Sequence, residues 1–396
     1  MPKSTRTRRT GKSPKPYPEF PLTAHPSGRW CKKFQGKQHY FGKLNDWRAA
    51  LERYEREWPY IITGRTPPSL GDENGYTLRD LCNEFLTDRK HKLESGELSL
   101  HTFSEYKRTC ERLIEFFKRE RLVSDLRPED FREYRKHLAK GCGAVTLASK
   151  INRCRVVFKF AYDNRRIDRP VEYGASFDRP SAKSLRKARN ESGPRMFEAA
   201  ELQRIIEASD PMMKAMVLLG LNAGFGNTDV ANLPRSAVDL KRGWVDFPRE
   251  KTGVMRRCPL WPETVESLRQ VESVRPDPID EADDDLCFIT SRGTRYVRIQ
   301  ESKTTEGRHV TINSLSRRFE SPLKRLEING RRGLGFYTLR HVFETIAGES
   351  RDQVAVNAIM GHVDNSMAAV YRERISDKRL VAVVETVRKW LWPEST

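Results

Sequence analysis

Apolar residues recur at helical spacing along most of the chain, and this pattern predicts a mainly α-helical protein with small β-sheets, an α+β fold. Four amphipathic helices are expected within residues 76–165, which we interpret as one helical domain. The fourth, from about residue 144 to residue 162, should bury Leu147, Ile151, Cys154 and Phe158. Residues 196–396 should form another domain, which contains helices and a hairpin at residues 250–260.

The chain before residue 63 follows a different pattern. Residues 1–20 combine basic residues with Pro, Ser and Thr and offer almost nothing to bury, so we expect a disordered basic arm. Residues 21–62 should form a small module, in which two short strands meet at a Gln35–Gly36 turn. A helix capped by Asn45 or Asp46 should follow, burying Trp47, Leu51, Tyr54 and Trp58.

Two stretches with few apolar residues separate these parts. Residues 63–75 are rich in Gly, Pro and polar residues, and residues 166–195 are rich in arginine. Neither stretch has enough apolar side chains to build a core of its own. We therefore expect both to be linkers, the second of them basic.

The charge indicates a polyanionic partner. The chain has 73 Lys and Arg against 54 Asp and Glu, a formal net charge of +19. Residues 1–70 alone hold fifteen basic and five acidic residues, so more than half of the surplus lies there. Seven cysteines without a C-x-x-C pair are typical of reduced thiols in a cytoplasmic protein. No apolar run is long enough to cross a bilayer, and we expect no membrane contact.

Candidate chemistry concentrates in residues 337–371. The apolar pattern predicts one helix that carries Arg340 and a second that ends at Gly361, just before His362. A third, short helix should carry Tyr371. A phenol with a pKa of about 10 needs a positive field to ionise at neutral pH. The arginine fork suits the negative charge that develops on a phosphoryl group under attack, so the set fits a metal-free attack on a phosphodiester.

The order of these residues resembles the tyrosine recombinase (phage integrase) family. An Arg-His pair begins at Arg340, a Gly-His pair ends at His362, and Tyr371 follows nine positions later. The resemblance implies that residues 76–165 are the family's helical core-binding domain. It implies that residues 196–396 are the catalytic domain.

The resemblance also implies a mechanism and the residues that perform it. Tyr371 would attack a DNA phosphate and form a 3′-phosphotyrosyl link, with Arg340 and His362 in support. Lys251, on the hairpin, would protonate the 5′ oxygen that leaves. The reaction would break and rejoin DNA at specific sites without metal, ATP or any other cofactor.

Two positions depart from the family pattern. The family's G-x-R-x-x-E motif has Gly226 where the first arginine is expected, although the acid persists as Asp229. Tyr337 replaces the histidine of H-x-x-R, and its phenol can donate a hydrogen bond but is a poor proton shuttle near neutrality. We expect slow but real cleavage, with the missing charge supplied from elsewhere; Arg256 and Arg257 on the hairpin are the candidates.

The expected partner is double-stranded DNA, bound by two surfaces. The N-terminal module is similar to the arm-site or AP2-like modules of integrases, and it should expose Lys32, Lys33, Lys37 and Lys43. The last helix of the helical domain should offer phosphates a stripe made of Lys150, Arg153, Arg155 and Lys159. A merely solvated helix face is the alternative for that stripe.

The spacing of apolar residues in the final segment predicts an amphipathic helix, whose apolar face consists of Leu380, Val384, Val387 and Leu391. The resemblance implies a homotetramer on paired DNA sites, with this helix docked on a neighbouring subunit. Docking in cis is the alternative for a single chain off DNA.

Two other functions stay open at this point. A catalytically weakened DNA-binding protein of the same fold would be compatible with Gly226 and Tyr337. A type IB topoisomerase-like nicking enzyme would share the active-site chemistry. Formation of a covalent adduct separates the enzyme from the binder, and strand exchange separates the recombinase from the topoisomerase.

Overall fold

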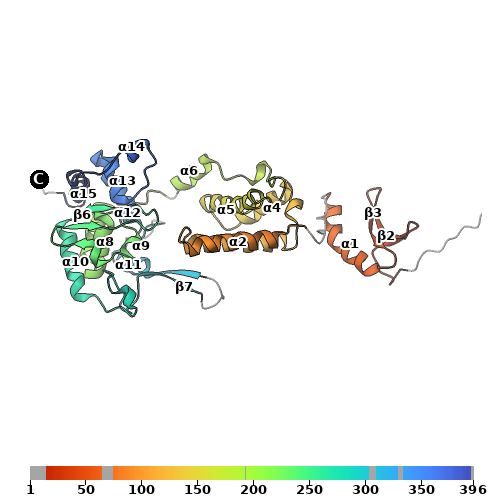
Figure 1. The fold of residues 1–396 in the computed structure, drawn as a ribbon, viewed down its shortest axis with the longest axis horizontal. Helices are drawn as coiled ribbons and strands as arrows, with labels where there is room; N and C mark the ends of the chain where they lie inside the picture. The colour runs from red at the N-terminus through yellow and green to blue at the C-terminus, as the bar shows by residue number, and fades with distance from the viewer. Residues whose placement is uncertain (1–14, 65–74, 192, 303–308, 329–332, 394–396) are drawn as a thin grey trace, which may run out of the picture. The chain divides into compact units, whose positions relative to one another are not determined.

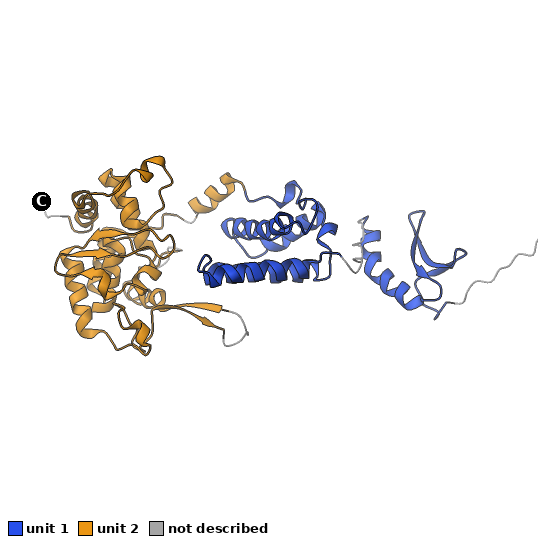
Figure 2. Ribbon diagram, in the orientation of Figure 1, with its two compact units in different colours: residues 1–180 blue, residues 181–396 orange. Residues whose placement is uncertain are grey.

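The computed structural model divides the chain into two compact units, residues 1–180 and 181–396 (Figure 2). The described residues are 15–64, 75–191, 193–302, 309–328 and 333–393. Most of the expected arm and most of the first expected linker lie outside them. No helix among the described residues is long and apolar enough to span a membrane. All seven cysteines are free thiols, and six of them are buried.

The N-terminal module is a three-stranded antiparallel sheet with one helix. It contains β1 (Thr23–His25), β2 (Arg29–Phe34), β3 (Lys37–Lys43) and α1 (Trp47–Ile62). Gln35 and Gly36 both have positive φ, at 47° and 79°, as a two-residue hairpin turn requires. Asp46 caps α1 by accepting from the Ala49 amide. The predicted hairpin and helix are confirmed, and β1 is an addition.

The helical bundle, residues 75–180, contains the four predicted helices. They are α2 (Leu78–Glu94), α3 (Leu100–Phe117), α4 (Pro128–Ala139) and α5 (Ala144–Asp163), with a short η1 (Val123–Asp125). Thr77 and Asp80 form a capping box at the start of α2, and Pro128 occupies the first turn of α4. The helices share one core, which includes Phe85, Leu113, Phe131, Ile151 and Phe158.

The bundle extends further along the chain than the sequence indicated. Phe177, in η2 (Ala175–Phe177), is fully buried in the bundle core, and Val171 and Tyr173 pack against the same core. The boundary between the units therefore falls after residue 180, inside the stretch expected as a linker. A few apolar residues in a basic stretch are enough to attach it to a core that already exists, and composition alone does not show this.

The C-terminal unit is mainly helical, with short antiparallel strands (Figure 1). Its helices are α6 (Ala182–Glu191), α7 (Ala199–Glu207), α8 (Pro211–Asn222), α9 (Asn227–Ala231), α10 (Pro262–Val274), α11 (Ser314–Arg325), α12 (Thr338–Ala347), α13 (Gln353–Met360), α14 (Met367–Val370) and α15 (Asp377–Leu391), with short turns η3 (Arg235–Ala237), η4 (Glu281–Asp283) and η5 (Gly348–Ser350). One sheet has the order β4 (Val238–Asp239), β5 (Trp244–Asp246), β6 (Arg257–Pro259), and β7 (Val297–Glu301) pairs with β8 (His309–Asn313). Figure 1 shows the β7–β8 hairpin extending from the helical body of this unit.

Helix α12 lies at the centre of this unit and contacts α8, α13 and α15. Its Leu339, Val342 and Phe343 are fully buried. Gly220 of α8 allows the close approach, because a Cβ there would lie 2.9 Å from the Leu339 side chain. Because of this packing, Arg340, which follows Leu339, points into the protein interior.

The last helix, α15, docks in cis in this chain. Five apolar side chains are buried against its own unit: Leu380, Val383, Val384, Val387 and Leu391. The Trp261 indole donates to the Val384 carbonyl at 3.0 Å, and Arg388 forms a bidentate pair with Glu263. The apolar face that we expected to dock in trans is therefore occupied, and docking on a neighbour would first require its release.

Removal of residues 377–396 should unfold the C-terminal unit. Burial of each of these five side chains contributes about 1.5–3 kcal/mol, and domains are stable by only about 5–15 kcal/mol. We expect calorimetry to show loss of the unfolding transition of this unit, while that of the helical bundle persists. A chain that ends at Pro393 is the control and should keep both. Retention of both transitions by the shorter chain would show that cis docking does not stabilise the unit.

Candidate active site

Arg340 is a deeply buried and hydrogen-bonded cation of the C-terminal unit. It is 3% exposed, and its guanidinium donates to the carbonyls of Gly224 and Met360. Its Nη2 also lies 3.1 Å from Nε2 of His362. Burial, followed by the charge of Arg249, lowers the pKa of Arg340. The structure thus brings together two of the predicted catalytic residues, which are 22 positions apart in the chain.

Two glycines with positive φ shape the turns around Arg340. Gly224 (φ 62°) and Gly361 (φ 65°) adopt the left-handed conformation that favours glycine. A Cβ at Gly361 would lie 2.8 Å from side-chain atoms of both Arg249 and Arg256. Gly361 ends α13 as predicted, and the turn presents the carbonyls that Arg340 and its neighbours bind.

His362 emerges at this turn as a neutral imidazole. Since Arg340 only donates, Nε2 of His362 must accept, which places the proton on Nδ1. Nδ1 lies 3.4 Å from Oδ1 of Asn357 and 3.9 Å from a buried oxygen of Glu344. Burial lowers the pKa of His362; the nearby Glu344 carboxylate opposes this shift, and the Arg340 and Arg249 charges add to it.

The hairpin between β5 and β6 packs onto the same turn. Phe247 donates to the Arg256 carbonyl and Arg249 to that of Val254, which brings the chain back over residues 250–253. Thr252 Oγ1 donates to the Gly361 carbonyl at 2.9 Å, and Arg249 Nη1 donates to the same oxygen at 3.3 Å. The sequence assigned no role to Arg249. Its position in the same hairpin, two residues before Lys251, is the signal that could have indicated it.

The other basic residues of the hairpin lie in different surroundings. Lys251 lies at the exposed tip. Arg256 is buried, pairs with Asp229 at 3.0 Å and stacks on Phe225. Arg257 pairs instead with Asp246 and Asp377 over the Trp244 ring. Arg257, one of the two candidates to replace the missing arginine, is thus engaged by two carboxylates away from the Gly361 turn. Arg256 reaches the site but is held by Asp229.

The two departures from the family pattern touch each other. A Cβ at Gly226 would lie 3.1 Å from Cε2 of Tyr337. The Gly226 amide donates to Asp229, whose other oxygen accepts from Arg256. The ring of Tyr337 thus fills the space beside Gly226, and its side chain stays half exposed.

Tyr371 follows the four-residue helix α14 and is 77% exposed. No hydrogen bond or ion pair joins its hydroxyl to Arg340, His362 or another described residue. Asp364 and Arg372 form an ion pair of 3.1 Å that closes the segment in which Tyr371 lies. The structure therefore leaves the expected nucleophile on the surface, outside the arginine and histidine cluster.

Residues 195–377 match the model of the phage integrase family, and residues 77–174 match that of the phage integrase SAM-like domain. The chain belongs to the phage integrase family of tyrosine recombinases. No curated protein sequence matches it. The integrase fold is also shared with solved structures, at identities that are informative about the fold only.

Three of these solved structures are similar over most of the chain. A lambda integrase tetramer bound to a Holliday junction is 16% identical, with a TM-score of 0.55, and the match covers 90% of this chain and 96% of that one. A lambda integrase dimer bound to a COC′ core site is 16% identical, with a TM-score of 0.56, and the match covers 92% of this chain and 98% of that one. The Tn1549 transposon integrase in complex with circular intermediate DNA is 14% identical, with a TM-score of 0.53, and the match covers 78% of this chain and 99% of that one.

The expected DNA-binding residues of this integrase are only partly available. Lys33, Lys37 and Lys43 are exposed on the N-terminal module. Lys32 lies on the side of β2 that faces α1, where its ammonium donates to the Tyr54 hydroxyl at 2.6 Å and lies over the Trp58 ring. The expectation that Lys32 is exposed is wrong, because alternate residues of a strand face opposite sides.

The stripe expected on α5 is also wrong. At about 100° per residue, Lys150 and Arg153 lie on one side of the buried face and Arg155 and Lys159 on the other. Arg153 pairs with Glu105 at 2.9 Å, Arg155 with Asp178 and Lys159 with Asp163, both at 2.6 Å. Lys150 donates to the Leu138 carbonyl. Each of these side chains thus has a partner in its own domain, although Lys159 stays exposed.

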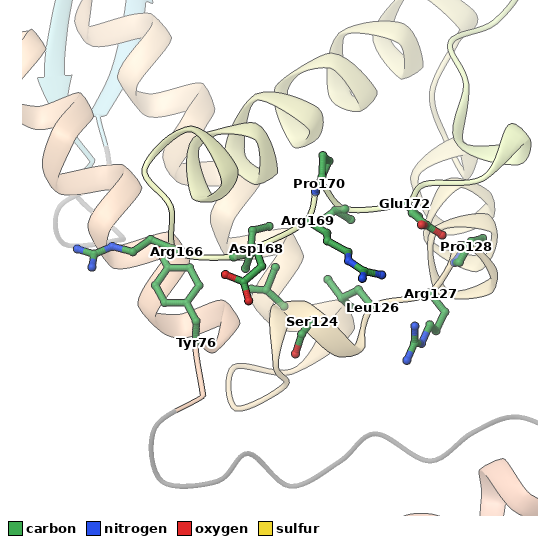
Figure 3. A pocket seen from close by; sticks show the side chains of 13 residues that line it. Tyr76, Ser124, Leu126, Arg127, Pro128, Arg166, Asp168, Arg169, Pro170 and Glu172 are labelled. Carbon is green, nitrogen blue, oxygen red and sulfur yellow. The ribbon is translucent and has the colours of Figure 1, made fainter.

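A cavity of about 420 Å³ lies in the helical bundle, beside α4 (Figure 3). Its charged lining residues are Arg127, Arg166, Asp168, Arg169 and Glu172. Basic and acidic groups alternate around it, so the charge does not favour one class of ligand. We assign the cavity no role in the site.

Glu344→Gln should lower the pKa of His362 further. The Glu344 carboxylate stabilises the imidazolium, and its removal leaves burial and the arginine charges unopposed. Imidazole NMR shifts measured against pH would report the change. Glu349→Gln, an exposed carboxylate in η5, is the control and should leave the titration unchanged. A rise in the His362 pKa in Glu344→Gln would contradict the assignment.

The lowered pKa of His362 also determines how its contribution to folding stability depends on pH. The pKa of His362 is lowered in the folded state, so the unfolded state binds more protons just below pH 6.5, the ordinary value. The contribution of neutral His362 to folding stability is therefore present above about pH 6.5. It is lost as the pH falls through the pKa that His362 has in the folded state.

Proposed function

We propose that this integrase cleaves and rejoins DNA at specific sites through a 3′-phosphotyrosyl intermediate. Tyr371, as phenolate, forms the bond to phosphorus while the bond from phosphorus to the 5′ oxygen breaks. Lys251 gives a proton to that leaving oxygen. The energy of the broken bond is kept in the new ester, so the reverse attack by a 5′ hydroxyl rejoins the strand.

The observation that carries this proposal is the cluster of guanidinium groups around the Gly361 turn. Arg340 and Arg249 donate to adjacent carbonyls, of Met360 and Gly361, and His362 follows directly. Such a cluster offers fixed positive charge to the non-bridging oxygens of a phosphate, where negative charge increases during attack. It also favours ionisation of a phenol brought next to it.

The positions of Lys251 and Tyr371 fit substrate-induced assembly of the site. Both are exposed, Lys251 at a hairpin tip and Tyr371 after a single helical turn, and neither is held by a partner among the described residues. Short exposed segments reorganise at small cost. We propose that bound DNA draws both residues to the phosphate that Arg340 holds.

The proposed substrate is double-stranded DNA, bound by a homotetramer on paired sites. The net charge of +19 and the lambda integrase dimer bound to a core site support the first part. The lambda integrase tetramer bound to a Holliday junction supports the second. Docking of α15 on a neighbouring subunit stays a prediction, and it requires release of the contacts to Trp261 and Glu263.

A covalent-adduct assay tests the reaction. On a nicked suicide substrate that carries the protein's own site, wild type should accumulate a covalent protein–DNA adduct, because the leaving strand diffuses away. Tyr371→Phe should bind the site equally well and give none. Arg340→Ala should slow adduct formation by about 10²- to 10³-fold, since it removes a fixed charge from the transition state.

The alternative is a DNA-binding protein of the same fold, which Gly226 and the exposed position of Tyr371 favour. If wild type and Tyr371→Phe bind the site tightly and are equally inert, this alternative is correct. In that case the recombination reaction has to be withdrawn.

The N-terminal module should bind DNA phosphates. Replacing Lys33, Lys37 and Lys43 together by Gln should lower the slope of log affinity against log salt by up to about 0.9 for each lysine–phosphate pair that is removed, because fewer counterions are released. Filter binding at several salt concentrations measures this slope. Lys32→Gln is the matched control and should leave it unchanged, since aromatic rings already cover that ammonium. An unchanged slope in the triple variant would rule out the module as a phosphate-binding surface.

A further inference from the structure

We propose that Arg249 supplies the charge that Gly226 removes, by donating to a non-bridging oxygen of the phosphate that Tyr371 attacks. This inference rests on the proposed function and assigns a further catalytic residue to it. Arg249 lies in the hairpin that joins β5 and β6, two residues before Lys251, and not on the α8–α9 turn. Its Nη1 donates to the Gly361 carbonyl at 3.3 Å, next to the Met360 carbonyl that accepts from Arg340.

Arg249 has donors to spare. A guanidinium carries five N–H groups in a rigid fork. Among the described residues, only the Gly361 carbonyl accepts from the Arg249 side chain, which is half buried. No carboxylate pairs with it there. A half-buried fork held on one side by a carbonyl, with its remaining donors free, is pre-positioned for a bidentate contact with phosphate.

The other basic residues nearby are less suited to this role. Arg256 is buried, with two donor atoms used by Asp229 and the Phe247 carbonyl. Arg257 is held by Asp246 and Asp377. Lys251 presents a single flexible ammonium and has its own part in the reaction. Arg249 combines proximity to His362 with available donors.

The electrostatics of the cluster indicate an anionic ligand. Arg249, Arg256 and Arg340 surround the Gly361 turn, and Asp229 is the carboxylate paired with one of them. The Arg249 charge adds to burial in lowering the pKa of Arg340, so the two guanidiniums repel each other. A phosphate oxygen between them would replace this repulsion with two charge-assisted hydrogen bonds. The cluster thus holds more positive charge than the carboxylate beside it neutralises.

Single-turnover formation of the covalent adduct tests the proposal. On the suicide substrate, Arg249→Ala should be slower than wild type by about 10²- to 10³-fold, the usual effect of removing one preorganised donor. Arg249→Lys should fall between them, because it keeps the charge and loses the fork. Arg257→Ala, in the same hairpin, is the matched control and should react like wild type. Equal rates for Arg249→Ala and wild type would overturn the proposal.

A second substrate separates a phosphate contact from a structural role. A methylphosphonate at the cleaved position has a methyl group in place of one charged oxygen, so the charge that Arg249 would offset is absent. The defect of Arg249→Ala should shrink to less than about tenfold on the isomer that lacks the contacted oxygen. A defect of the same size on the phosphate and on both methylphosphonate isomers would mean that Arg249 only supports the hairpin, and it would refute the proposal.

If wild type forms no adduct, the proposed function fails. Measurements of DNA binding then still test the contact between Arg249 and phosphate. Removal of one arginine–phosphate pair in Arg249→Ala should then reduce the salt slope of binding to the same site by about one. Arg257→Ala should leave that slope unchanged. An unchanged slope for Arg249→Ala would overturn the phosphate contact whatever the reaction.

Discussion

The candidate active site depends on the carbonyl groups at the C-terminal turn of α13. The Met360 oxygen accepts from Arg340, and the Gly361 oxygen accepts from both Arg249 and Thr252. The last carbonyls of a helix have no partner within the helix, and they lie at the negative end of its dipole. They are therefore suitable acceptors for buried cations. One turn thereby joins α12, α13 and the hairpin, which are distant in sequence.

This arrangement explains how a cluster of arginines can exist without bound DNA. Burying a charged group costs several kcal/mol unless it is hydrogen-bonded. Arg340 has carbonyl acceptors, and Arg256 has Asp229 as well as the Phe247 carbonyl. These contacts position the guanidiniums without neutralising them all. The remaining excess of positive charge is what a phosphate can use.

Local patterns in the sequence were sufficient for much of the fold. The apolar faces of α2 to α5 and α12, the Gln35–Gly36 turn and the terminator Gly361 all follow from residue type and spacing. Arg340 and His362 meet as expected, because the helix phases were correct. Contacts between distant residues were not predictable. Arg249 binds a carbonyl 112 positions away, and no local pattern indicates that pair.

Several basic residues show the same limit of sequence patterns. Lys32 and the basic residues of α5 were assigned to DNA from their charge alone. Whether a cation is free depends on the partner that folding brings to it: Tyr54 for Lys32, Glu105 for Arg153 and Asp178 for Arg155. Charge predicts the class of partner, but tertiary packing decides which cations remain available.

The contact between Gly226 and Tyr337 makes the two departures from the family pattern one physical change. A side chain at position 226 would begin 3.1 Å from the Tyr337 ring, which is tighter than an ordinary carbon contact. An arginine there would have to displace a ring that also packs edge-on against His341. With that route occupied, the proposed phosphate contact comes from the hairpin side, where Arg249 already lies against the Gly361 turn. Glycine at position 226 therefore leaves the α8–α9 side of the turn without a charge, while Arg249 keeps one on the hairpin side.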